Sequence, residues 1–171
     1  MRNAKFILLA AIAIVVFASA SFAQTEKQIA AIRAEVQAIN KGAAKYTKKT
    51  KNLYDLSTEG AEVTYYTSGK DLKKIVAKIY GESGNKTNEY FYQGEDLIFV
   101  FEKLNHYDNP IGAATSPKVV RVEETRAYFE GGKCIRLLNG KKTIKADTVE
   151  FDEQIYEIVE TADTIKGGFD W

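Results

Sequence analysis

Three similar turn phrases constrain the fold of this chain more than any other feature. In each phrase an aromatic strand end is followed by a polar residue, a glycine, two polar or glycine residues and an apolar restart; the phrases lie at residues 66–72, 91–97 and 128–134. Glycine permits the positive φ of a tight reversal, and aromatic residues suit a half-buried pleated surface. The phrases therefore predict three β-hairpins, with strands at 61–67 and 72–80, at 88–92 and 97–104, and at 119–129 and 134–138.

The strand expected after the second turn phrase is apolar on both sides, as are strands at the centre of a covered sheet. In residues 97–104 strict alternation would place Leu97, Phe99 and Phe101 on one face and Ile98 and Val100 on the other. We therefore expect this strand to be central and to be covered on both faces.

One amphipathic helix is expected before the hairpins and another after them. Apolar residues recur at intervals of three and four in both regions: Ile29, Ile32, Val36 and Ile39 in the first, and Phe151, Ile155, Ile158, Ala162 and Ile165 in the second. The first helix should run from Thr25 to Lys41. The second should begin with a capping box formed by Asp147 and Glu150 and end at residues 167–168. These elements predict an α+β fold: a mainly antiparallel sheet of about six strands, flanked by an N-terminal and a C-terminal helix.

The first 23 residues have the order of a secretory signal peptide. Arg2 and Lys5 precede an apolar run, and small residues follow it as far as Ala23. We expect cleavage after Ala23, which would leave residues 24–171 as a single α+β domain in the periplasm or outside the cell. No other stretch approaches the roughly 20 apolar residues of a membrane span, so no transmembrane segment is expected after processing.

The charge pattern gives no indication of a nucleic-acid partner. Loss of Arg2 and Lys5 would change the formal net charge from +1 to −1. Five lysines between residues 41 and 51 are not interrupted by an acid and could attract phosphates. Because no aromatic-interleaved nucleic-acid motif accompanies them, a solvated loop or exposed strand edge is the favoured interpretation. The acidic side of the second helix could lie near these lysines in the fold.

The sequence contains no catalytic, metal or cofactor signature. Its one histidine, His106, and its one cysteine, Cys134, cannot supply the three or four ligands of a zinc site. No nucleophile elbow accompanies His106. Cys134 begins an apolar strand segment and is expected to be a buried free thiol. We therefore predict no catalytic residue, no metal and no cofactor. The alternative is a hydrolase of an envelope glycan or peptide that uses two carboxylates distant in the sequence.

A binding role is the leading expectation. Residues 105–118 form a long segment that carries both prolines, and such loops often bind ligands, although it could also be a crossover between hairpins. Aromatic rings supply contact area at a modest entropic cost, although each could equally be a core residue. The candidate binding residues are Tyr65, Tyr90, Tyr92, His106, Tyr107 and Asp108. We expect an exported, non-enzymatic protein that binds another protein or an envelope component through an aromatic sheet face and this loop.

The three turn phrases resemble the hairpin units of MORN-like repeat proteins, and the layout is similar to small exported α+β proteins of bacteria with no assigned activity. The resemblance covers only the three short phrases between Tyr66 and Cys134. It implies a binding or scaffold role, and it assigns no functional residue.

Overall fold

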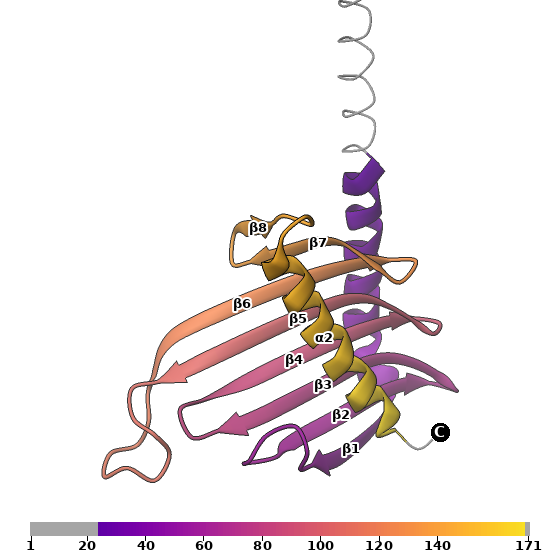
Figure 1. Cartoon of the computed structure of the whole chain (residues 1–171). Coiled ribbons are helices and arrows are strands. Elements are labelled where there is room, and N and C mark those ends of the chain that lie inside the picture. The colour runs from indigo at the N-terminus through magenta and orange to yellow at the C-terminus, as the bar shows by residue number, and fades with distance from the viewer. Residues whose placement is uncertain (1–23, 170–171) are drawn as a thin grey trace, which may run out of the picture.

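The computed structural model describes residues 24–169, so the expected signal peptide lies outside the described residues. Eight antiparallel strands form one sheet in which neighbours in sequence are also neighbours in space (Figure 1). Residues 24–42 are helical and lead into a short 3-10 helix, η1 (Ala43–Lys45); α2 (Val149–Gly167) follows the last strand. The strands are β1 (Thr47–Leu53), β2 (Ala61–Ser68), β3 (Asp71–Gly81), β4 (Gly84–Gln93), β5 (Asp96–Tyr107), β6 (Val119–Glu130), β7 (Lys133–Asn139) and β8 (Lys142–Ile144). The predicted α+β class and the three hairpins are confirmed.

The sheet has two strands beyond the six that were expected, and both lie at its edges. β1 contains the last three lysines of the lysine-rich segment, Lys48, Lys49 and Lys51, and its polar residues give no apolar alternation from which a strand could be predicted. Charged residues on an edge strand discourage pairing with other chains. β8 has only three residues and pairs with β7. The expected exposed strand edge is therefore β1.

The two helices cover opposite faces of the sheet (Figure 1). We call the face under α2 the α2 face and the other the outer face. The core of the α2 face includes Val63, Tyr65, Ile75, Tyr90, Val100, Phe129 and Leu137, packed against Phe151, Ile158, Ala162 and Ile165 of the helix. The core of the outer face includes Phe91, Ile98, Phe99 and Tyr128, packed against Ile29, Ile32 and Ile39 of the N-terminal helix.

A β-bulge changes the faces predicted for the start of β5. Phe91 pairs with Phe99 but Tyr92 pairs with Leu97, so Ile98 is an extra residue in β5. As a result, Leu97 packs against the α2-face core and Ile98 against the outer-face core. The expectation that β5 is covered on both faces is correct, but the sides assigned to Leu97 and Ile98 are wrong.

The ends of α2 are fixed by local contacts. The N-cap is Thr148, whose Oγ1 accepts a hydrogen bond from Phe151 N at 3.3 Å, and not Asp147 as predicted. At the other end, Lys51 Nζ of β1 donates to Gly168 O at 2.9 Å. A cation is favourable there because helix carbonyls are unpaired and the helix dipole is negative. Lys51 thus meets α2 at a backbone carbonyl of its C-terminal end, and not on the acidic side that was considered from the sequence. None of the helices within residues 24–169 is long and apolar enough to cross a membrane.

Candidate functional site

Three of the tyrosines predicted to be exposed lie in the core. Tyr65 and Tyr90 are 0% exposed and Tyr92 is 2% exposed, because all three point to the face that α2 covers. Tyr65 Oη donates to Ile165 O of α2 at 2.8 Å. Burial raises the pKa of both Tyr90 and Tyr92 above the ordinary tyrosine value. The expectation that these rings form an exposed aromatic face is therefore wrong.

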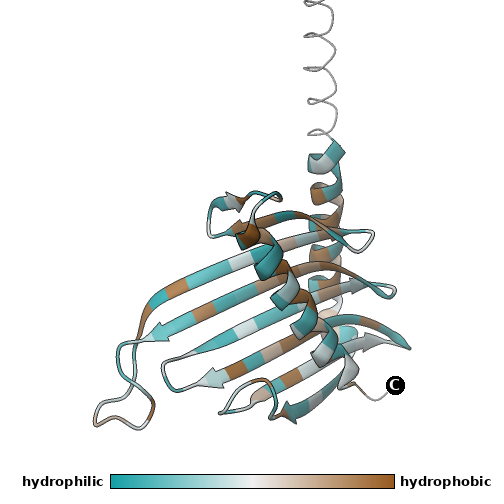
Figure 2. Cartoon of the chain, in the orientation of Figure 1, coloured by the Kyte–Doolittle hydropathy of each residue, from teal (hydrophilic) through white to brown (hydrophobic). Residues whose placement is uncertain are grey.

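Exposed apolar residues gather instead at one end of the sheet, where the β3–β4 turn and residues 108–118 lie. We call them the loop-end patch: Tyr80, Ile111, Val119, Val120 and Val122. Their side chains are between 40% and 64% exposed. Figure 2 shows apolar residues at the start of β6 and in the adjoining loop, among polar strand ends. A concentration of this kind is typical of an interaction surface.

A row of amide and aromatic side chains supports the patch on the outer face. Tyr80 pairs with Asn85, Asn85 with Asn105, and Asn105 with Val122, so the four side chains lie side by side across β3 to β6. Asn105 Nδ2 donates to Asn85 Oδ1 at 2.8 Å, and Asn85 Nδ2 donates to the hydroxyl of Tyr107. These bonds fix the orientation of Tyr107 beside the patch.

The loop between β5 and β6 is held by backbone contacts at its base and flank. Asp108 Oδ1 accepts a hydrogen bond from Lys118 N at 2.8 Å, and Asp108 N donates to Lys118 O at 3.0 Å. Ile111 N donates to Glu82 O of the β3–β4 turn at 2.9 Å. The carboxylate of Asp108 closes the loop, and the loop presents Ile111 next to β3 and β4.

His106 lies on the opposite face from Tyr107, because successive strand residues point to opposite sides. His106 Nε2 is 3.1 Å from Glu123 Oε1 and 3.1 Å from Arg121 Nη2. The three consecutive candidates therefore do not form one cluster. Tyr107 lies beside the patch, Asp108 closes the loop, and His106 joins a charged group on the α2 face.

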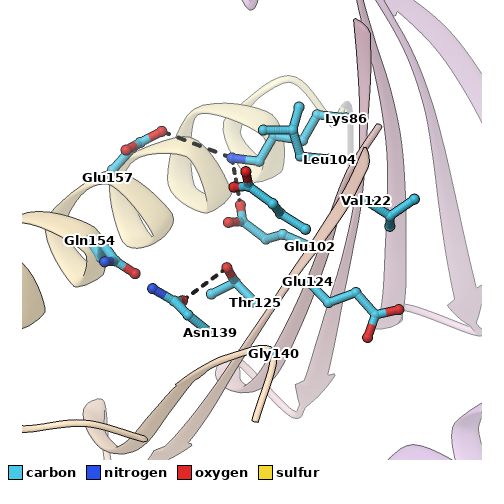
Figure 3. Close-up of a pocket in the computed structure, with 11 residues that line it drawn as sticks. Lys86, Glu102, Leu104, Val122, Glu124, Thr125, Asn139, Gly140, Gln154 and Glu157 are labelled. Atoms are coloured by element: carbon cyan, nitrogen blue, oxygen red, sulfur yellow. Dashed lines mark hydrogen bonds and ion pairs between the residues drawn. The ribbon is translucent and has the colours of Figure 1, made fainter. Parts of the chain in front are cut away.

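A cleft between α2 and the loop end of the sheet is a second candidate site (Figure 3). Its volume is about 510 Å³. Lys86 Nζ lies between two carboxylates, 2.9 Å from Glu102 Oε1 and 3.9 Å from Glu157 Oε1. The other polar residues of the lining are Glu123, Glu124, Thr125, Asn139 and Gln154.

The cleft brings together two carboxylates distant in the sequence, as the alternative hydrolase would require. Because Lys86 contacts both Glu102 and Glu157, the arrangement is an ion-pair network. The structure therefore places two acids distant in the sequence in one cleft, where both lie within 4 Å of Lys86 Nζ.

Neither site was found from the sequence. The valines of residues 119–122 have the residue type of an ordinary strand. Whether such a valine is exposed or buried depends on whether a helix covers that part of the sheet, and the local sequence does not give this information. Glu102 directly follows the apolar run of residues 97–101, which could have marked it as a polar residue among core positions.

Cys134 is a half-buried free thiol at the start of β7. Its Sγ donates to Arg136 O at 3.3 Å. Burial raises the pKa of the thiol to about 11 from an ordinary value of 9.0. A thiol that is protonated at neutral pH is a poor nucleophile.

Within residues 24–169 no three His, Cys, Asp or Glu side chains are grouped so that they could hold a metal ion.

Comparisons with protein-family models, curated proteins and solved structures found no match to the chain. Any functional assignment therefore depends on the geometry.

Proposed function

We propose that this protein is an exported, non-enzymatic binding protein that contacts another protein or an envelope component through the loop-end patch. The observation that carries the proposal is the gathering of five exposed apolar side chains at the end of the sheet that carries the long loop. Apolar groups of this size stabilise a complex when a partner removes them from water, by roughly 25 cal/mol per Å².

The surroundings of the patch also favour binding. The patch combines apolar side chains with the amides of Asn85 and Asn105 and the ring of Tyr107. A partner surface can therefore gain both apolar contact and directional hydrogen bonds. Because the loop is held by Asp108 and by the β3–β4 turn, little ordering entropy is lost on binding.

The test replaces three valines of the patch with threonine in one variant: Val119→Thr, Val120→Thr and Val122→Thr. Threonine keeps the shape and β-branching of valine, so the exposed strand should remain intact while the patch becomes polar. The matched control is Val149→Thr, because Val149 is also an exposed valine, 71% exposed, but lies at the start of α2. Both variants are checked by thermal unfolding before use.

Immobilised mature protein is used to capture partners from an envelope extract, and the affinity of each captured partner is then measured with the purified components. We expect the triple variant to bind on the order of tenfold to 100-fold more weakly, and the Val149→Thr control to bind as the parent does. Equal binding by the folded triple variant, or the absence of any partner for the parent, would overturn the proposal.

A further inference from the structure

One flank of α2 carries an apolar stripe that is not covered by the rest of the described chain. Figure 1 shows α2 lying across the sheet with no other described element over it. Ile155, Tyr156 and Val159 line a groove of about 590 Å³ whose walls come only from α2. Tyr156 is 69% exposed, whereas Ile155 and Val159 are half-buried because they also pack against the core of the α2 face. We call this flank the α2 groove.

Acidic side chains stand at both ends of the stripe and along its edge. Asp152 precedes the stripe, Asp163 follows it and Glu160 flanks it, and all three are exposed. Within residues 24–169 none of the three forms an ion pair, unlike Glu150 and Glu157 on the other flank, which pair with lysines of the sheet. The carboxylates around the stripe are therefore available to the cations of a partner.

The spacing of these groups defines the shape of the partner. Asp152 and Asp163 are separated by about three helical turns, so they project from the same side of α2 and lie about 16 Å apart along its axis. A helix packed along α2 would meet an apolar centre with a negative charge near each end. Its complement is an amphipathic helix that has an apolar stripe and a basic residue on either side of it.

A second copy of this chain does not provide that complement through its own α2. Two α2 helices packed on each other would bring the three carboxylates of each copy together. Like charges placed opposite each other in an interface oppose association. Charge complementarity therefore selects a basic partner, and not a symmetric dimer through this helix.

From these observations we infer that the α2 groove is a docking surface for a basic amphipathic helix of another protein. Apolar side chains of the partner cover Ile155, Tyr156 and Val159, and its lysines or arginines pair with Asp152 and Asp163 at the two ends. An arginine can also stack on the exposed ring of Tyr156. The α2 groove and the loop-end patch lie on opposite faces of the sheet, so this inference goes beyond the proposed function and does not depend on it.

The probe is a synthetic peptide of leucine, alanine and lysine with a length of about 18 residues, enough for a helix to form in isolation. Its lysines flank a leucine stripe at a separation of three helical turns. The matched peptide has glutamate in place of each lysine. Fluorescence anisotropy of the labelled peptide is followed as mature protein is added at pH 7 and low salt. We expect the lysine peptide to bind with a Kd of roughly 100 μM or tighter, and the glutamate peptide at least tenfold more weakly.

A pair of double variants tests the charges of the groove. Asp152→Asn with Asp163→Asn removes the charge at each end and should weaken binding of the lysine peptide about tenfold. The matched control is Glu59→Gln with Glu82→Gln, which removes two exposed carboxylates at the loop end of the sheet and should leave the affinity unchanged. Both double variants are checked by thermal unfolding before use.

A pair of tyrosine variants tests the apolar stripe. Tyr156→Ser removes the most exposed ring of the groove and should weaken binding of the lysine peptide several-fold. The matched control is Tyr54→Ser, because Tyr54 is 76% exposed but lies between β1 and β2. This control should bind the peptide as the parent does.

Equal affinity of either test variant and its matched control would overturn the inference, because the charges or the stripe would then play no part. Equal binding of the lysine and glutamate peptides would also overturn it, as would the absence of binding by the lysine peptide up to about 1 mM protein. A dimer of the parent in sedimentation experiments that Tyr156→Ser dissociates would show that a second copy covers the stripe instead.

Discussion

At the scale of single residues, the face of the strand decides what each side chain can do. Tyr92 and Tyr90 lie under α2, whereas Phe91 between them packs against the N-terminal helix. Tyr107 and His106 are likewise neighbours in the sequence with separate surroundings. Residue type alone therefore identified Tyr107 as a surface candidate but failed for Tyr90 and Tyr92.

Cys134 gives a prediction with a defined pH dependence. Its pKa is raised to about 11 by burial, whereas the unfolded thiol has a value of 9.0. Since the raised pKa belongs to the folded state, this group's contribution to stability is fully present below pH 9.0 and is lost as the pH rises toward about 11. We expect a water-soluble disulfide reagent to label the native protein at pH 8 at least tenfold more slowly than the urea-unfolded protein, and the difference to shrink above pH 10.

The control for this labelling experiment is Cys134→Ala, which should show no reaction in either state. Rapid labelling of the native parent at pH 8, or a disulfide-linked dimer under non-reducing conditions, would show that the thiol is exposed.

At the scale of elements, the sequence predicted the hairpins, because residue types within each turn determine where the chain reverses. Gly69, Gly94 and Gly131 adopt φ values of +63°, +61° and +55°, as the turn phrases required, and the hairpins follow from them. β1 and β8 could not be predicted because neither has an apolar alternation; each is a strand only because its neighbour in the sheet offers backbone partners.

The faces of the strands were less predictable than the strands themselves. Bulges such as the one at Ile98 shift the alternation by one residue, and no single residue type marks them. The cleft needs Lys86, Glu102, Thr125 and Asn139 to share a face, which depends on the register of three strand pairs. This long-range information is not present in any local stretch of the sequence.

The pairing of β4 with β5 predicts a strong effect at Gly84. A Cβ atom at this position would lie 2.2 Å from Asn105 O, a backbone atom that cannot move away without displacing β5. We expect Gly84→Ala to lower the free energy of unfolding by about 1–3 kcal/mol, as measured by urea denaturation. The matched control is Gly81→Ala, where the nearest atom would be Gly84 O at 3.4 Å, and the change should be within about 0.5 kcal/mol. Equal stability of both variants would contradict this account of the strand pairing.

At the scale of the whole molecule, the helices divide the sheet into covered and uncovered parts. The N-terminal helix packs on the outer face at the end away from residues 108–118, and α2 crosses the other face (Figure 1). The loop-end patch is therefore uncovered on the outer face. Val122 belongs to the patch and also lines the cleft, so the two candidate sites adjoin each other at this end of the sheet.

Export is the prediction that concerns the whole chain. The first buried side chain of the N-terminal helix is Ile29, so cleavage after Ala23 would leave every described core residue in place. We expect intact-mass measurement of the exported protein to give a chain that begins at Gln24. The matched variant is Ala23→Arg, which places a large charged residue where signal peptidase requires a small one and should block cleavage at this position. An exported product of the parent that retains residues 1–23 would show that this segment is not a cleaved signal, and the binding partner would then have to be sought without assuming an exported protein.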